Sequence, residues 1–186
     1  GYFKSEICPI TSDDGVIDED GCIRDTSLES MSKLKPVFRN NGSVTAATSS
    51  PLTDGAVCML VCSSEFAEKN GLEPLARIVT SAVTGCPPNM MGIGPISSTQ
   101  KALERSGWHI DDIDVFEINE AFSSQSIAVI NELSIDYQKV NIDGGAISIG
   151  HPLGASGARI VGKAASILNR TNSERAIATM CIGGGM

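Results

Sequence analysis

The sequence predicts an α/β fold, in which strands and helices alternate around a buried sheet. Short apolar runs of strand length recur along the chain, and segments with helical spacing separate them. A polar, glycine-broken loop, Gly150 to Gly157, joins an apolar run to a helix-like run. Two other apolar runs lead into the segments Asn119 to Phe122 and Cys181 to Gly185. Asn, His and Cys side chains are therefore expected to converge from three strand ends.

The first forty residues predict a loop-rich surface. They carry charge clusters, and only Ser27 to Leu34 has helical spacing, which Pro36 ends. The residues from Ser43 to Pro51 are small and polar. Ala56 to Cys62 then forms a continuous apolar run, which predicts a strand buried on both faces.

The middle of the chain predicts two helices and another strand. Ser63 to Asn70 is typical of a short helix that stops at Gly71, and Leu75 to Ala82 of a strand. Cys86 to Pro95 holds too much proline and glycine for regular structure. Ser97 to Ser106 has helical spacing and ends before Gly107.

The last third of the chain alternates between the two kinds of element. The expected helices are Ala121 to Leu133 and Ala158 to Leu168. The expected strands or strand-like runs are Ile113 to Ile118, Val140 to Ile142, Gly145 to Ile149 and Arg175 to Cys181.

Composition excludes several classes of protein. The net charge is -8 and the basic residues are scattered, which argues against a nucleic-acid surface. No run approaches the roughly 20 apolar residues of a membrane span, and the first residues lack a signal-peptide pattern. Six cysteines without a regular spacing indicate a reducing compartment rather than a disulfide framework.

Three residues are the candidates for chemistry. A neutral imidazole at His151 can take a proton from a thiol or hydroxyl near neutral pH. Cys181 precedes three glycines whose N–H groups can form an oxyanion site and lower the pKa of the thiol, so it can act as nucleophile or acid/base. Asn119 can donate to a carbonyl oxygen or hold a water.

Each candidate also has a plainer interpretation. His151 fits a surface loop and Cys181 fits a core, although the surrounding glycines favour a site. Glu120 can orient a histidine or cap the following helix. Met90 and Met91 can line a pocket for an acyl chain or fill the core. His109 has no such setting and is interpreted as structural or solvated.

Taken together, three motifs resemble the C-terminal motifs of the thiolase family in order and spacing. They are Asn119-Glu120-Ala121-Phe122, Gly150-His151-Pro152-Leu153-Gly154-Ala155-Ser156-Gly157 and Cys181-Ile182-Gly183-Gly184-Gly185. The stretches Val44 to Ala46, Leu52 to Ala56 and Met91 to Pro95 also resemble the family. The resemblance covers nearly the whole chain.

The resemblance implies a duplicated α/β fold, of which this chain is the C-terminal half: a mixed sheet with helices on both faces, plus remnants of the loop domain and first half. Residues 1–53 resemble the end of the loop domain, residues 54–72 the last strand and helix of the N-terminal domain, and residues 73–186 a truncated C-terminal domain. Residues 183–186 directly follow a strand, and the expected strand at Ala56 to Cys62 has few partners upstream. The sequence is therefore expected to be part of a longer protein.

The resemblance also assigns roles. His151 resembles the base that activates a nucleophilic cysteine, Cys181 the acid/base that moves the α-proton of acetyl-CoA, and Asn119 the holder of an oxyanion-site water. The Gly183 N–H resembles the donor of a second oxyanion site. Ser50 resembles a contact to the pantetheine arm, and the substrate-binding set is completed by Met91 and Phe122.

The expected function is therefore acyl transfer: thiolytic cleavage of a 3-ketoacyl-CoA, or condensation of two acetyl-CoA molecules to acetoacetyl-CoA. Coenzyme A is a substrate, and no cofactor or metal is expected. The family's nucleophilic cysteine belongs to the missing N-terminal half, so this chain alone is expected to be inactive. The complete protein is expected to be a homodimer or homotetramer in the cytoplasm of a bacterium, or in the mitochondrion or peroxisome of a eukaryote. The alternative is a stand-alone, non-enzymatic module that binds CoA thioesters or a partner protein; a condensing enzyme of the ketosynthase type fits less well.

Overall fold

The centre of the fold is a pair of parallel strands in the computed structural model, which describes residues 1–186. β3 (Val115–Ile118) pairs with β4 (Ala176–Thr179), and Phe116 lies beside Ile177. A parallel bridge from Val140 to Phe116 extends this pairing. Parallel pairing places the carboxyl ends of both strands at one edge of the sheet.

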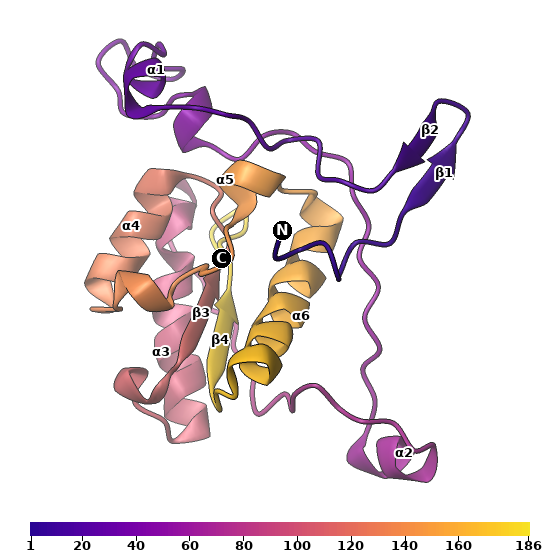
Figure 1. The fold of residues 1–186 in the computed structure, drawn as a ribbon. Helices are drawn as coiled ribbons and strands as arrows, with labels where there is room; N and C mark the ends of the chain where they lie inside the picture. Colours follow the sequence, from indigo (N-terminus) through magenta and orange to yellow (C-terminus); the bar gives the residue numbers. More distant parts are fainter.

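Three helices cover the two faces of this pair (Figure 1). α3 (Gly94–Ser106) and α4 (Ser123–Glu132) lie on one face, and α6 (Leu153–Thr171) lies on the other. The expected α/β fold with helices on both faces is confirmed by these three layers.

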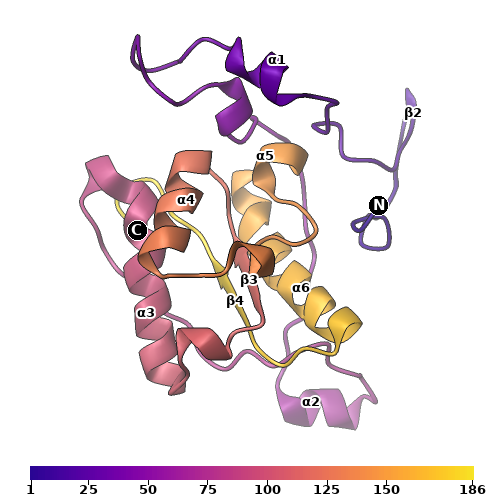
Figure 2. The same ribbon diagram turned by 60° about the vertical axis from the view of Figure 1, so that its left-hand side comes forward.

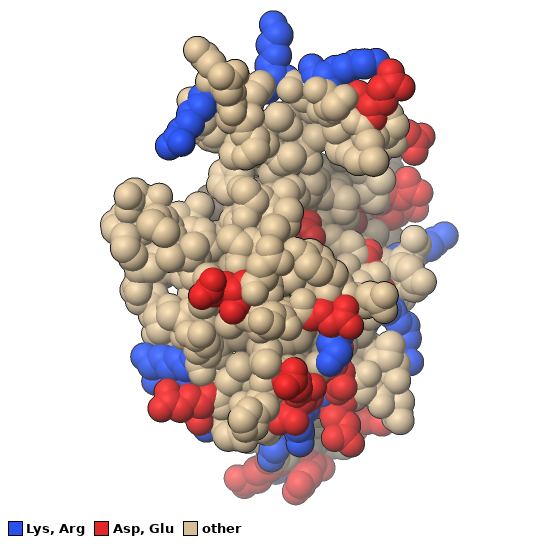
Figure 3. Space-filling view, turned by 90° about the vertical axis from the view of Figure 1, so that its left-hand side faces the viewer, with Lys and Arg blue, Asp and Glu red and all other residues tan.

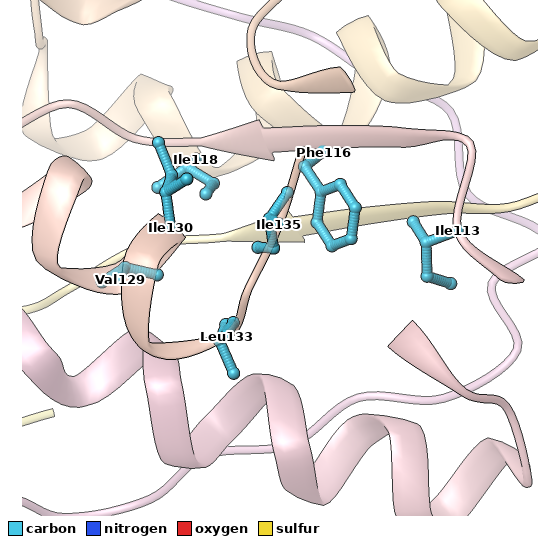
Figure 4. Close-up of a cluster of buried hydrophobic side chains, with 7 residues drawn as sticks. All are labelled: Ile113, Phe116, Ile118, Val129, Ile130, Leu133 and Ile135. Carbon is cyan, nitrogen blue, oxygen red and sulfur yellow. The ribbon is translucent and has the colours of Figure 1, made fainter. Parts of the chain in front are cut away.

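The hydrophobic core lies between β3 and the helices of the first face (Figure 4). Successive side chains of a strand point to opposite faces, so Phe116 and Ile118 enter this core while Glu117 faces α6. The buried cluster consists of Ile113, Phe116, Ile118, Val129, Ile130, Leu133 and Ile135. Burial of one such side chain stabilises the fold by about 1.5–3 kcal/mol.

The three long helices were all predicted, but two of them begin earlier than expected. α3 starts at Gly94, with Pro95 in the first turn, and ends at Gly107, whose φ of 70° gives the left-handed cap that glycine favours. α6 starts at Leu153 instead of Ala158. Most of the glycine-broken loop is therefore the beginning of a helix.

The apolar run at residues 145–149 is a helix instead of the predicted strand. α5 (Ala146–Ile149) is one turn long, and the Ser148 and Ile149 N–H groups donate to Gly145 O at 3.0 and 3.2 Å. By composition, a short apolar run fits a strand and a buried helical turn equally well. The backbone hydrogen bonds to Gly145 O show that this run is a helical turn. Short 3-10 segments complete this half: η2 (Pro88–Ile93), η3 (Ile110–Asp112) and η4 (Tyr137–Lys139). Of these, η2 occupies part of the predicted irregular loop.

The first 70 residues form an arm outside the three layers (Figures 1 and 2). Its elements are β1 (Ile10–Ser12), β2 (Gly15–Ile17), α1 (Leu28–Ser32), η1 (Ala46–Thr48) and α2 (Ser64–Lys69). The predicted helices at 27–34 and 63–70 are confirmed, and each is capped by the serine that precedes it, Ser27 or Ser63.

The two strands predicted at 56–62 and 75–82 do not form. Both segments lack regular structure and pair with no other strand. Their aliphatic side chains are largely exposed, including Leu60 at 72% and Ile78 at 61%. An apolar run becomes a strand only when a neighbour accepts and donates its backbone hydrogen bonds. The sheet is therefore parallel and two-stranded, smaller than the predicted mixed sheet.

The start of the arm is fastened to α6 by a buried lysine. Lys163 Nζ lies 2.9 Å from Glu6 Oε1, 3.3 Å from the Tyr2 carbonyl oxygen and 2.7 Å from Asp143 Oδ2. The Lys163 side chain is wholly buried, and its charge is balanced by these carboxylates.

The surface carries both charge signs side by side. In the face shown in Figure 3, Lys and Arg side chains lie among Asp and Glu side chains and form no single basic patch. None of the helices combines the length and apolar character needed to cross a lipid bilayer.

Candidate active site

The carboxyl ends of the two central strands form the base of the site. The Asn119 N–H, directly after β3, donates to the Thr179 carbonyl oxygen at the end of β4 at 2.9 Å. The Asn119 side chain is fully buried, and Cys181, two residues beyond β4, is 5% exposed. The two candidate residues that follow strands therefore leave the sheet at the same edge.

His151 reaches this edge from the turn between α5 and α6. Gly150 has φ 102°, and a Cβ atom at Gly150 would collide with the Thr53 side chain, so this turn requires glycine. Thr53 Oγ1 also accepts the His151 N–H at 3.3 Å. His151 thus follows a helical turn, not the strand that was predicted, but it occupies the expected edge.

The His151 ring is held from both sides. Its Nε2 lies 3.2 Å from Asn119 Nδ2, and its Nδ1 lies 2.6 Å from the Ser156 hydroxyl in the first turn of α6. The Asn119–His151 contact joins residues 32 positions apart and links two of the three sequence motifs directly. The predicted proximity of Asn119 and His151 is confirmed.

The surroundings of His151 favour its neutral form. Burial, and then the positive charge of Arg159 on α6, lower the pKa of the imidazole below its ordinary value. The ring is consequently unprotonated near pH 7 and can accept a proton.

The surroundings of Cys181 favour the thiol. Burial raises the pKa of Cys181, with a smaller raising contribution from Cys86, and together they outweigh the lowering by a backbone N–H. The expectation that the following glycines lower this pKa is therefore wrong. Burial destabilises the thiolate by more than a hydrogen bond from one N–H group stabilises it. A protonated Cys181 suits transfer of a proton better than unassisted attack.

The glycines after Cys181 form an open turn. Ile182 N–H donates to Met186 O at 2.7 Å, and Met186 N–H donates back to Ile182 O at 3.2 Å. The N–H groups of Gly183 and Gly184 donate no hydrogen bond, and both residues are exposed. Two adjacent free donors next to a buried thiol can bind an oxyanion.

Glu120 has neither of the roles considered for it. Its carboxylate accepts Asn141 Nδ2 at 2.6 Å and the Ile147 N–H at 3.1 Å, so it caps α5 and does not touch the His151 ring. A Cβ atom at Gly145 would collide with this carboxylate. Glu120 therefore fixes the helical turn that leads into His151.

Asn141 is a supporting residue that sequence reasoning missed. Its side chain accepts the Ile118 N–H and donates to the Ile118 carbonyl oxygen, both at 2.8 Å, as a neighbouring strand would. Its own backbone has φ 45°, a conformation in which asparagine is enriched. The only signal for this role in the sequence is that asparagine adopts a positive φ more readily than most residues.

The three residues expected to bind substrate lie around the Phe122 turn. The Ser50 N–H and hydroxyl donate to the Ala121 carbonyl oxygen at 3.1 and 3.3 Å. Met91 and Phe122 line one pocket of about 280 Å³ between η2 and α4. Gln125, with both polar side-chain atoms buried and unpartnered, lines the same pocket.

Two ionisable residues, Glu117 of β3 and Arg159 of α6, lie behind the site. Glu117 is 1% exposed, and burial raises its pKa to about 8 although Arg159 and Lys163 act against this. Arg159 Nε and Nη1 are buried without a partner, as is Glu117 Oε1. No group of three or more His, Cys, Asp or Glu residues has an arrangement that could hold a metal ion.

The exposed His109 lies outside the site, as expected. Its N–H donates to Asp112 Oδ2 at 2.9 Å, and its side chain is exposed at the start of η3. It serves the turn that leads to β3.

Comparison with family models places both parts of the chain. Residues 72–186 match the model described as thiolase, C-terminal domain, and residues 1–65 match the model described as thiolase, N-terminal domain. Together these matches cover all but the six residues 66–71.

Similar proteins carry related names. The chain is 47% identical to an acetyl-CoA acetyltransferase of Shinella zoogloeoides and 48% identical to a 3-ketoacyl-CoA thiolase of Marinobacter nauticus. All of this chain aligns in both, against 49% and 50% of those proteins. The chain therefore spans about half the length of the curated relatives it matches.

Solved structures show the same likeness. The Bacillus anthracis acetyl-CoA acetyltransferase superposes on this chain with TM-score 0.95 at 43% identity, over all of this chain and 48% of that one. Human mitochondrial 3-ketoacyl-CoA thiolase in complex with CoA superposes with TM-score 0.93 at 41% identity, over all of this chain and 47% of that one.

Proposed function

Because this chain belongs to the thiolase family, we propose that it is the C-terminal part of an acyl-CoA C-acyltransferase. The complete enzyme cleaves a 3-ketoacyl-CoA with coenzyme A, or condenses two acetyl-CoA molecules to acetoacetyl-CoA. The observation that carries this proposal is the hydrogen bond between Asn119 and the His151 ring, at the sheet edge from which a buried thiol and two free N–H groups also emerge. Acyl transfer to and from a thioester needs a base, a proton donor and donors to an oxyanion.

Each residue then has one role. His151 Nε2 takes the proton of the nucleophilic thiol, and Asn119 holds the water of the first oxyanion site. Cys181 moves the α-proton of the acetyl group, and its protonated resting state supports the direction in which the thiol donates that proton, which is thiolysis. The free Gly183 N–H stabilises the second oxyanion.

The nucleophilic cysteine is supplied by the N-terminal half of the protein. The exposed aliphatic side chains of residues 56–62 and 75–82 support packing of that half against this one, because contiguous apolar surface is costly to leave in water. Residues 1–53 then end the loop domain, residues 54–72 complete the N-terminal domain, and residues 73–186 belong to the C-terminal domain.

The pantetheine arm and acyl chain lie between the halves, beside Ser50, Met91 and Phe122. The pocket lined by Met91 and Phe122 supports this placement. The complete protein acts in fatty acid metabolism as a cytoplasmic homodimer or homotetramer without a resident cofactor. Six free cysteines support a reducing compartment.

The test is an assay of the complete protein with acetoacetyl-CoA and coenzyme A, following loss of the 3-ketoacyl thioester. Turnover above about 1 s⁻¹, a rate ordinary for enzymes, supports the proposal. Binding of coenzyme A without turnover favours a non-enzymatic module. The mass of the native polypeptide in cells, expected to be about double that of this chain, shows whether the second half lies on the same polypeptide.

A further inference from the structure

Ser156 is a buried hydroxyl in contact with the candidate base. Its side chain is fully buried in the first turn of α6, and its Oγ lies 2.6 Å from His151 Nδ1 and 3.1 Å from the Pro152 carbonyl oxygen. A hydroxyl has one proton to donate, and a carbonyl oxygen can only accept. The direction of these bonds therefore determines where the imidazole carries its proton.

One assignment satisfies every contact around the ring. Asn119 Nδ2 can only donate, so His151 Nε2 accepts and carries no proton. The proton of the neutral ring then lies on Nδ1 and is donated to Ser156 Oγ. The Ser156 hydroxyl in turn donates to Pro152 O, completing a chain in which all donors point one way.

We propose that Ser156 is a positioning residue that holds His151 in its Nδ1–H form and so keeps Nε2, which here accepts from Asn119 Nδ2, free of a proton. This inference rests on the proposed acyl transfer. When the nucleophilic thiol gives its proton to Nε2, the S–H bond breaks, the N–H bond forms, the hydrogen bond from Asn119 Nδ2 is released and the ring becomes imidazolium. Nδ1–H still donates to Ser156, so the ring changes charge without turning.

The local backbone holds Ser156 next to the His151 ring. Pro152 directly precedes α6 and fixes the chain direction after His151, and the helix then returns Ser156 to the ring within its first turn. Arg159, one turn further along α6, is the charged group whose field acts on the ring. A neutral ring with a fixed tautomer is the form that serves as a base.

The experiment uses the complete protein labelled with ¹⁵N-histidine, as wild type and as Ser156→Ala, Ser156→Thr and Ser166→Ala. Ser166 is the matched control, because its hydroxyl lies on the same helix but bonds to Glu6 at 2.9 Å. The ¹⁵N shifts report which ring nitrogen carries the proton, whether or not the protein turns over.

We expect the wild type and Ser166→Ala to show Nδ1–H at His151, and Ser156→Ala to show a mixture with Nε2–H. We also expect Ser156→Ala to lower kcat at least about 10-fold with KM for acetoacetyl-CoA within about 2-fold, the signature of a lost catalytic orientation. Ser156→Thr, which keeps the hydroxyl, restores Nδ1–H and part of kcat.

Two results overturn the inference. One is an Nε2–H form of His151 in the wild type, which needs no variant to fold. The other is an unchanged Nδ1–H form in a folded Ser156→Ala protein. Absence of thiolysis in the wild type, with the Nδ1–H form present, counts against the proposed function and not against the role of Ser156 in fixing the ring.

Discussion

Asn119 Nδ2 lies 3.2 Å from His151 Nε2, so the amide that follows β3 meets the nitrogen that is to accept a proton. The amide is fully buried, and its Oδ1 has no partner. A neutral amide at this position stabilises a neutral ring, which agrees with a lowered pKa of His151. The charge state of residue 119 should therefore control the charge state of the ring.

Replacing Asn119 by aspartate tests this control. A carboxylate next to Nε2 favours the imidazolium, so the pKa of His151 should rise by at least about 1 unit. In the complete enzyme the acidic limb of kcat/KM then moves to higher pH, and activity at pH 7 falls. Asn169→Asp adds the same charge at an exposed position of α6 and should leave the profile in place. An unmoved acidic limb in Asn119→Asp would contradict the assignment of His151 as base.

Removing either proton-transfer group should nearly abolish turnover. His151→Ala and Cys181→Ala in the complete enzyme are each expected to lower the rate of thiolysis at least ~100-fold, the usual size of a lost acid/base group. The matched controls are His109→Ala and Cys8→Ala, at exposed positions, which should keep wild-type rates. A near-normal rate of thiolysis in His151→Ala or Cys181→Ala would contradict the proton-transfer role proposed for that residue.

Local signals in the sequence account for the long helices and for the two central strands, β3 and β4, but not for the outcome at residues 56–62 and 75–82. The Gly107 cap and Ser63 cap are read from single residues and their neighbours, and the corresponding helices form where predicted. Residues 56–62 and 75–82 are as apolar as any strand, yet a strand exists only through its partners. Composition cannot reveal a partner that lies elsewhere.

The site shows the same limit. Asn119, His151 and Cys181 were found because glycines and strand ends surround them in the sequence. The role of Glu120 depends on Asn141 and Gly145, more than 20 residues away, and only the folded chain brings them together. The pKa of Cys181 was misjudged for a related reason, since burial is a property of the fold and not of the adjacent glycines.

The raised pKa of Cys181 should be visible in its reaction with iodoacetamide, in which the thiolate attacks the reagent and displaces iodide. In the native complete protein, labelling of Cys181 should be slow at pH 7 and should rise at higher pH than in the urea-unfolded protein, where burial is lost. Mass spectrometry of the peptide that contains Cys181 measures both rates. Faster labelling at pH 7 in the native protein would mean an activated thiolate instead.

Removing one partner of the buried Asp143–Lys163 pair should lower the free energy of unfolding strongly. Lys163 Nζ lies 2.7 Å from Asp143 Oδ2, and the side chains are 0% and 2% exposed. Asp143→Ala is expected to lower the free energy of unfolding by about 3–5 kcal/mol because it leaves a buried lysine with less compensation. Asp143→Leu combined with Lys163→Met should lose less than the sum of the single changes, as urea unfolding of the complete protein can measure.

The same aspartate should make stability fall in acid. Burial acts to raise the pKa of Asp143, but the hydrogen bonds from Arg170 and Lys163 outweigh it and hold the pKa below 3.8. A depressed pKa contributes stability above the unfolded value near 3.8, and this contribution is lost as pH falls through the folded value. The difference in unfolding free energy between wild type and Asp143→Ala should therefore shrink below about pH 4. A difference that stays constant there would contradict the stabilising role of the ionised Asp143 beside Lys163.

Glu117 should produce the opposite pH dependence. Burial raises its pKa to about 8 from an ordinary value of 4.5, so the folded protein holds a proton that the unfolded chain releases between these limits. The stability that this proton confers is complete below pH 4.5 and is lost as pH rises toward about 8, at about 1.4 kcal/mol per unit at most.

Glu117→Gln keeps the shape of the protonated acid and cannot ionise. Its thermal midpoint should equal that of the wild type near pH 4.5 and exceed it increasingly toward pH 8.5. Glu132→Gln, on the exposed side of α4, serves as control and should show no such trend. If Glu117→Gln is instead destabilised at pH 8.5, the ionised carboxylate is paired with Arg159, and this buried pair stabilises the contact between β3 and α6.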